Sequence, residues 1–161
     1  METKQLYLYD SYQKEFEARI QSVNGNQVIL DQTAFHPLTG GVAHDTGHIT
    51  KNNVMHEVLR VEINRETKEI THVLDDAGGL SAGDTVKGVL NWERRYRLMR
   101  LHTAAHLIAA IMYRDYNALI TGGQVDCEQA KLDFNLSMGL VIVDVCGWFV
   151  IFLASFLVWV V

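Results

Sequence analysis

Two histidines, His102 and His106, lie four residues apart in the stretch RLHTAAHLIAA at residues 100–110. On an α-helix this spacing places both imidazoles on one side, one turn apart, where they can offer two nitrogen ligands to one metal ion. A structural zinc site needs four protein ligands and a catalytic one usually three. The pair therefore predicts half of a metal site, with two satisfied side chains at the edge of a hydrophobic core as the alternative.

A second candidate is the glycine-rich segment TAFHPLTGGVAHDTGHI at residues 33–49. Its proline and glycines predict a structured loop, either a plain connection between strands or a loop that closes over a small ligand. Gly40 and Gly41 belong to this loop, and in the second case Thr33 offers a hydroxyl group. The three histidines of this segment have no recognisable metal-ligand spacing; they are His36, His44 and His48.

Four arginines precede the histidine pair in the run WERRYRLMR at residues 92–100: Arg94, Arg95, Arg97 and Arg100. A charged run at the start of a helix is commonly a solvated face. The same side chains next to a candidate site can instead contact the phosphate backbone of RNA. The sequence leaves both interpretations open.

The elements that must position these groups change type near residue 90. Before it, short alternating segments are separated by turns, as in EFEARIQSV (15–23), the dipeptide Asn24-Gly25 and QVILDQTAF (27–35). An Asn-Gly dipeptide between two such segments is typical of a tight β-hairpin. Several short strands at this spacing predict a small antiparallel β-barrel.

After Asn91 the hydrophobic period becomes that of a helix, with Asn91 as the N-cap and Asn117 as the stop. A turn at Gly122-Gly123 and a strand at residues 131–136 should follow. The expected fold class is α+β, with domains at residues 1–90 and 91–138 and a tail at 139–161. One apolar stripe should face the core, formed by Leu98, Leu101, Ala105, Ile108 and Met112.

Composition limits the function classes. The chain has 161 residues with a net charge of −5, so it is a poor general nucleic-acid binder, although its local arginine cluster permits a focused phosphate contact. Two cysteines give no disulfide framework. The N-terminus lacks the basic start and apolar core of a signal peptide, so a cytoplasmic location is expected.

The tail differs from everything before it, because its last 17 residues, 145–161, carry no charge. We expect a truncation or frameshift that replaced the original C-terminal part. The alternatives are a membrane anchor through residues 145–161, at the lower length limit for a spanning helix, and a strand and helix buried in a rearranged domain.

The ordered motifs resemble a known family. TAFxP, GG and DTG (33–47), then GDxVxGxxxWxRRxxLMRxHTAxH (83–106), then ITGxQ and LDF (120–134) are similar to the free-standing, AlaX-type alanyl-tRNA editing proteins. These are related to the editing domain of alanyl-tRNA synthetase. The resemblance runs from about residue 5 to residue 136, and the segment WERRYRLMRLHTAAHLI is its most specific part.

The resemblance implies a function and a site. Such proteins hydrolyse tRNA(Ala) mischarged with serine or glycine, on a fold that joins a β-barrel to a zinc-dependent α/β editing domain. By motif, His102 and His106 are the first two zinc ligands, and Thr33 matches a position that senses a seryl hydroxyl. Gly40 and Gly41 match the glycine-rich loop, and Arg94, Arg95, Arg97 and Arg100 are the candidates for contact with tRNA.

The sequence departs from the family twice. Val42-Ala43 stand where the loop usually reads Gln-Pro, and the family's later Cys-x-x-x-His ligand pair is missing, so the editing domain is expected to be incomplete and the chain inactive. The alternative function is a non-catalytic tRNA-binding or interaction module, with membrane attachment not favoured.

Overall fold

The computed structural model describes residues 2–136, 139–146 and 149–154, which form two compact units. The first unit comprises Met1–Gly40 and His44–Arg95, and the second comprises Gly41–Ala43 and Tyr96–Val161. The boundary predicted after residue 90 lies at the end of the strand that precedes the helix, and the first compact unit ends at Arg95. Three residues of the glycine-rich loop are grouped with the second unit.

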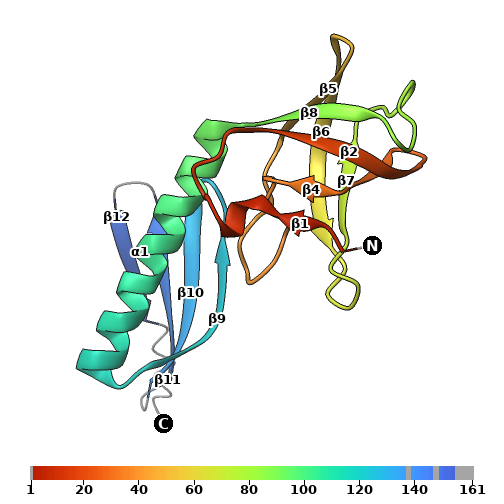
Figure 1. The fold of residues 1–161 in the computed structure, drawn as a ribbon. Helices are drawn as coiled ribbons and strands as arrows, with labels where there is room; N and C mark the ends of the chain where they lie inside the picture. The colour runs from red at the N-terminus through yellow and green to blue at the C-terminus, as the bar shows by residue number, and fades with distance from the viewer. Residues whose placement is uncertain (1, 137–138, 147–148, 155–161) are drawn as a thin grey trace. The chain divides into compact units, whose positions relative to one another are not determined.

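The first unit is a closed antiparallel barrel with the strand order β2-β3-β7-β6-β5-β8 (Figure 1), as the sequence predicted. A short parallel pair, β1-β4, and one 3-10 turn, η1, accompany it. The elements are β1 (Lys4–Gln5), η1 (Leu6–Leu8), β2 (Glu15–Asn24), β3 (Gln27–Leu30), β4 (Gln32–Thr33), β5 (Gly47–Lys51), β6 (Val54–Ile63), β7 (Ile70–Leu74) and β8 (Thr85–Leu90).

Alternation along β2 shows why these residues form a barrel. Phe16, Ala18 and Ile20 are buried, while the residues between them are exposed, so one face of the strand lines the core. The β2-β3 hairpin turns at Asn24-Gly25 as predicted, with Asn24 paired to Gln27 and Gly25 at φ +56°. Burial of this apolar face is the main force that closes the barrel.

The second unit consists of most of helix α1 (Trp92–Tyr116) and a four-stranded sheet in the order β12-β11-β10-β9. Figure 1 shows α1 lying along one face of that sheet. Three residues of the predicted helix stripe are buried in its core, and the other two, Leu101 and Ile108, are partly buried against it. The buried residues are Val42, Leu98, Ala105, Met112, Ala118, Val125, Ala130, Leu132 and Phe134. The strands are β9 (Leu119–Val125), β10 (Gln129–Leu136), β11 (Gly139–Cys146) and β12 (Phe149–Ala154).

Both predicted ends of α1 are confirmed. The Asn91 side chain accepts a hydrogen bond from the backbone N–H of Arg94 at 3.1 Å, which satisfies one of the unpaired donors of the first turn. At the other end Asn117 adopts a left-handed conformation with φ +51°, and its N–H donates to the Tyr113 carbonyl at 3.0 Å.

The predicted turn at Gly122-Gly123 is wrong, because both glycines lie inside β9. A side chain at either position would contact a neighbour tightly. A Cβ on Gly122 would lie 2.9 Å from an Asp133 carboxylate oxygen, and one on Gly123 would lie 3.2 Å from the Leu132 side chain. These glycines therefore permit close packing within a strand rather than a reversal of the chain.

The tail contributes strands to the sheet. β11 pairs antiparallel with β10, from Gln129–Cys146 to Leu136–Gly139, and β12 pairs antiparallel with β11. Residues 147–148 and 155–161 lie outside the described part of the chain, and with them the end of the segment considered as a membrane anchor. No helix within the described residues combines the length and apolar character needed to cross a membrane.

Candidate functional site

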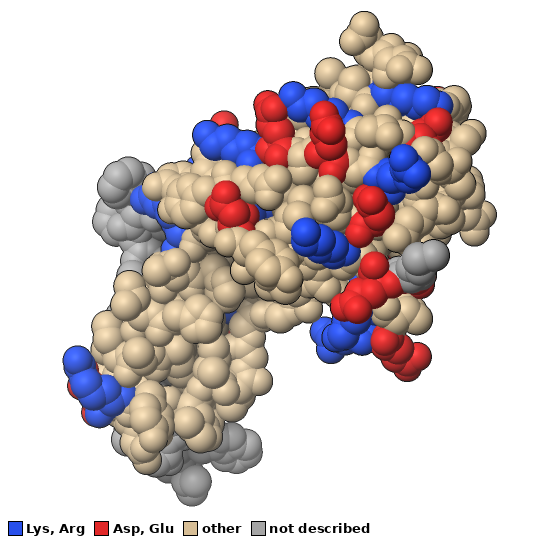
Figure 2. All heavy atoms as spheres, in the orientation of Figure 1, with Lys and Arg blue, Asp and Glu red and all other residues tan. Residues whose placement is uncertain are grey.

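The two histidines converge on an exposed flank of α1, beside its buried stripe. Their Nε2 atoms are 3.0 Å apart, and the ring centroids are separated by 4.6 Å. Both side chains are exposed, while Ala105 between them is buried against the sheet. Figure 2 shows no charged side chains on the visible side of the middle of α1.

The surroundings of His102 favour its neutral imidazole form. Partial burial lowers the pKa of His102, and the neighbouring His106 ring lowers it further, because two positive charges this close repel each other. A neutral imidazole nitrogen is the form that binds metal ions. The lowered pKa of His102 therefore favours the form of that ring that binds a metal ion.

The spacing of the pair fits one metal ion. Two nitrogens bound to a tetrahedral zinc at about 2.0–2.1 Å are about 3.3 Å apart, close to the observed 3.0 Å. Within the described residues, no cluster of three or more His, Cys, Asp and Glu side chains is placed to hold a metal. The described chain thus supplies two ligands of a set that needs at least one more.

Arg95 is buried, with a side chain only 5% exposed. Its guanidinium forms a bidentate ion pair with Asp45 and also donates to the carbonyls of Ala34 and Ser11. The Asp45 carboxylate in turn accepts a hydrogen bond from the N–H of His36 at 2.6 Å. These bonds engage the guanidinium inside the first unit and leave it unavailable to a phosphate.

The other three arginines differ in exposure. Arg94 is half-buried, and its Nε donates to the His44 carbonyl at 3.1 Å. Arg97 and Arg100 are exposed, and the Arg100 guanidinium lies 5.9 Å from the centre of the Tyr96 ring. Exposed guanidinium groups on consecutive turns of a helix have the chemistry needed for phosphate contacts.

Thr33 lies in the interior of the first unit and is fully buried. Its hydroxyl is 2.9 Å from His72 Nε2 and accepts the Phe35 N–H at 3.1 Å. The other ring nitrogen of His72 is 3.2 Å from the Val28 carbonyl, which fixes that nitrogen as the donor and Nε2 as the acceptor. The Thr33 hydroxyl therefore donates a hydrogen bond to Nε2 of His72.

His72 was not among the predicted site residues, although it is completely buried and borders Thr33. Burial lowers its pKa to about 4, so the ring is neutral near pH 7. In the sequence it occupies an inward position of an alternating strand, between Ile70 and Leu74. A polar residue at an inward position of a strand could have indicated a buried hydrogen bond.

The two glycines of the loop have different surroundings. A Cβ on Gly41 would lie 2.4 Å from the Gly123 carbonyl oxygen, whereas nothing lies within 4 Å of one on Gly40. Gly41 also accepts the Val125 N–H at 2.8 Å, and the Ala43 N–H donates back to Val125 at 2.9 Å. The segment Gly41–Ala43 thereby extends the sheet that carries α1, with Val42 in its core.

A family model described as tRNA synthetases class II (A) matches residues 2–94. An alanyl-tRNA editing protein AlaX-M from Saccharolobus solfataricus is 50% identical over 135 residues, which are 83% of this chain and 57% of that protein. AlaX-M from Methanosarcina barkeri is 40% identical over 140 residues, 84% of this chain and 58% of that protein. An alanine–tRNA ligase from Ignicoccus hospitalis is 40% identical over 134 residues, 82% of this chain and 14% of the ligase.

The chain spans a little over half the length of the AlaX-M relatives that it matches. The matched part of the ligase is a small fraction of that longer enzyme.

Proposed function

The chain belongs to the tRNA synthetases class II (A) family and is a homologue of the AlaX-M alanyl-tRNA editing proteins, and we propose that its site serves hydrolysis of tRNA(Ala) mischarged with serine or glycine. The observation that carries the proposal is the convergence of His102 and His106, whose Nε2 atoms are 3.0 Å apart on an exposed helix flank. The two rings would hold one zinc ion as half of its ligand set.

An aminoacyl ester is already activated, so a hydrolase must chiefly place a water molecule against the carbonyl and stabilise the developing oxyanion. A zinc ion with an open coordination position, when bound, supplies a site for that water or for the amino group of the substrate. The protein contributes the orientation of the ligands. His102 and His106 are fixed to each other by one turn of α1, which is anchored through Ala105 and Met112.

Discrimination against serine requires a group that recognises its hydroxyl. A purely apolar pocket rejects one additional hydroxyl poorly, whereas a polar partner distinguishes substrates far better. We assign this role to Thr33, whose Oγ1 donates to His72 and accepts from Phe35, which leaves one lone pair for a further hydrogen bond. In this proposal Thr33 acts as the acceptor and the seryl hydroxyl as the donor, which requires the substrate to open a path to a side chain that is 0% exposed in the free chain.

Contact with tRNA(Ala) is assigned to Arg94, Arg97 and Arg100 at the start of α1. Arg95 is left out of the proposed contact, because its guanidinium is engaged by Asp45 and two carbonyls. We also assign Gly40 and Gly41 to a loop that contacts the substrate. Gly41 packs closely against Gly123 of β9, whereas a Cβ on Gly40 would have no atom within 4 Å.

The proposal is tested by release of serine from Ser-tRNA(Ala) in the presence of zinc. Any serine that the wild-type chain releases should be lost in His102→Ala and in His106→Ala and retained in His48→Ala. His48 is a matched control, since it is a half-buried histidine outside the helix. Equal activity of His102→Ala and the wild type would contradict the proposal.

The small number of metal ligands among the described residues favours a second candidate function, that of a tRNA-binding module. Since the described residues contain no third metal ligand beside the pair, the chain by itself could act as a non-catalytic tRNA-binding module. This alternative predicts tRNA(Ala) binding that persists in His102→Ala, with no zinc bound and no serine released. Zinc binding that disappears in His102→Ala favours the hydrolase.

A further inference from the structure

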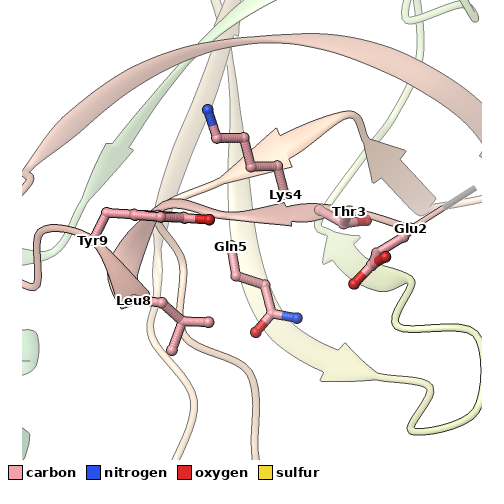
Figure 3. A pocket seen from close by; sticks show the side chains of 6 residues that line it. All are labelled: Glu2, Thr3, Lys4, Gln5, Leu8 and Tyr9. Carbon is pink, nitrogen blue, oxygen red and sulfur yellow. The ribbon is translucent and has the colours of Figure 1, made fainter.

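A pocket of about 360 Å³ lies at the N-terminal segment of the first unit. Figure 3 shows its lining: Glu2, Thr3, Lys4, Gln5, Leu8 and Tyr9. Two of these side chains are unusually exposed for their type, since Tyr9 is 81% and Leu8 71% exposed. Pockets of this size hold small organic ligands, and apolar side chains at their rim need a flat or apolar partner.

The aromatic ring of Tyr9 lines the pocket. The Lys4 ammonium lies 5.9 Å from the ring centre, and Figure 3 shows Lys4 on one side of the ring plane with Gln5 and Leu8 on the other. The ring is thus held by a cation on one face. The other side of the ring plane faces Gln5 and Leu8, and the Tyr9 side chain as a whole is 81% exposed.

The polar groups of the pocket include both donors and acceptors. Thr3 is already engaged, since its hydroxyl donates to the Leu30 carbonyl and accepts the Ile70 N–H. The Gln5 side-chain oxygen accepts the Tyr7 hydroxyl at 2.7 Å, which leaves the Gln5 amide NH₂ as a donor. Glu2 adds a carboxylate acceptor at the rim. An amide donor and a carboxylate acceptor beside an aromatic ring match the edge and the face of a nucleobase.

We propose that this pocket binds an unpaired nucleotide of RNA, with its base stacked on Tyr9 and an adjoining phosphate paired with Lys4. The base edge faces the Gln5 amide and the Glu2 carboxylate, which can accept from an exocyclic amino group of cytosine or adenine. Stacking on exposed aromatic side chains is the common mode of recognition of single-stranded RNA. This inference rests on the proposed function, because tRNA is the RNA that the chain would meet.

The same segment of the first unit carries a second aromatic and cationic group. Tyr12, which is 58% exposed, lies 5.6 Å from the Trp92 ring between centroids, and the Lys14 ammonium lies 4.7 Å from the Trp92 ring. Alternation of lysines and aromatic rings along a surface suits consecutive unpaired nucleotides, whose bases and phosphates alternate in the same way. Residues 4–14 therefore offer contacts for more than one nucleotide.

The test is binding of a fluorescein-labelled, single-stranded hexaribonucleotide, measured by fluorescence anisotropy on the full chain. Tyr9→Leu keeps an apolar side chain and removes the ring, so we expect affinity to fall by about 5- to 150-fold, the range for one base–aromatic stack. Tyr9→Phe keeps the ring and should bind like the wild type. Tyr116→Leu is the control, since Tyr116 is also exposed, at 63%, but lies at the end of α1.

Salt dependence tests the phosphate contact separately. Lys4→Gln should reduce the slope of log affinity against log salt by about 0.7, the value for one phosphate of a single strand. Circular dichroism melting of each variant checks that the barrel is intact, and the exposure of Tyr9 predicts unchanged melting.

Three outcomes would contradict the proposal that this pocket binds an unpaired nucleotide. The first is equal affinity of Tyr9→Leu and the wild type for the hexamer. The others are equal affinity of the chain for the hexamer and its fully paired duplex, and binding of CMP as tight as that of the hexamer. These outcomes are distinguishable from failure of the proposed function. A chain that binds and deacylates Ser-tRNA(Ala) without any effect of Tyr9→Leu rejects the pocket alone. A chain that binds neither the hexamer nor tRNA rejects both.

Discussion

Arg95 and Asp45 form a buried ion pair that joins the first turn of α1 to the loop after Thr33. The guanidinium Nε lies 2.9 Å from each Asp45 carboxylate oxygen, and the side chains are 5% and 1% exposed. The remaining guanidinium hydrogens reach the Ala34 and Ser11 carbonyls. One side chain thus connects three separate segments of the first unit.

Removal of Arg95 should therefore destabilise the protein far more than removal of an exposed arginine from the same helix. Arg95→Ala leaves the Asp45 carboxylate buried without its partner, which costs about 3–5 kcal/mol of unfolding free energy. Arg97→Ala should change stability by less than about 0.5 kcal/mol. Urea unfolding followed by tryptophan fluorescence measures both, and equal midpoints for the two variants would contradict the structural role of Arg95.

Substitutions of Gly41 and Gly40 distinguish the effect of close packing on stability from the effect of backbone conformation. Both have positive φ, +78° and +60°, but only Gly41 lacks room for a Cβ. Gly40→Ala should cost about 1–2 kcal/mol for its left-handed backbone. Gly41→Ala should cost more, and it should speed hydrogen exchange at the Val125 N–H, which donates to the Gly41 carbonyl. Unchanged exchange at Val125 in Gly41→Ala would show that the loop is not held against β9.

His72 gives the barrel a predictable response to acid. Its pKa falls from 6.5 in the unfolded chain to about 4 when folded, because burial disfavours the charged ring. The unfolded chain therefore binds more protons between these values, so stability is complete above pH 6.5 and declines as the pH falls toward 4, by about 3 kcal/mol. His72→Gln removes this titration. Urea unfolding at pH 7.5 and 4.5 should show a smaller loss for the variant, and equal losses would rule out His72 as the cause.

Thr33→Val tests the role of the buried hydroxyl in two ways. The change leaves His72 Nε2 and the Phe35 N–H without the hydroxyl partner, which should cost about 1–3 kcal/mol of stability, whereas Thr33→Ser keeps the hydroxyl. If Thr33 senses serine, Thr33→Val should also lose more activity on Ser-tRNA(Ala) than on Gly-tRNA(Ala). Equal losses on the two substrates would assign the hydroxyl to barrel stability alone.

Local patterns in the sequence predicted most of the architecture, because the residues concerned act through their own neighbourhood. Asn24-Gly25 forces a tight turn wherever it stands between two alternating segments. Asn91 and Asn117 satisfy backbone groups within one helical turn. The apolar stripe of α1 likewise depends on spacing alone, which places His102 and His106 on its exposed flank.

Features that depend on distant residues could not be predicted in the same way. Arg95 stands in a row of arginines and looks like its neighbours, but Asp45, fifty residues earlier, determines its burial. Gly122-Gly123 has the composition of a turn, and its close packing against Asp133 and Leu132 becomes visible only once β9 is paired with β10. The hydrogen bond between Thr33 and His72 joins positions 39 residues apart, so it can be recognised only when the closed barrel is known.

The central claim is that His102 and His106 together hold one metal ion. The most direct measurement is a zinc titration of the chain labelled with ¹⁵N at histidine, followed through long-range ¹H–¹⁵N spectra of the imidazoles. We expect the Nε2 signals of both residues to shift together, with one zinc per chain, and the shift at His106 to vanish in His102→Ala. Nε2 signals that stay unchanged while zinc is in excess would contradict the claim.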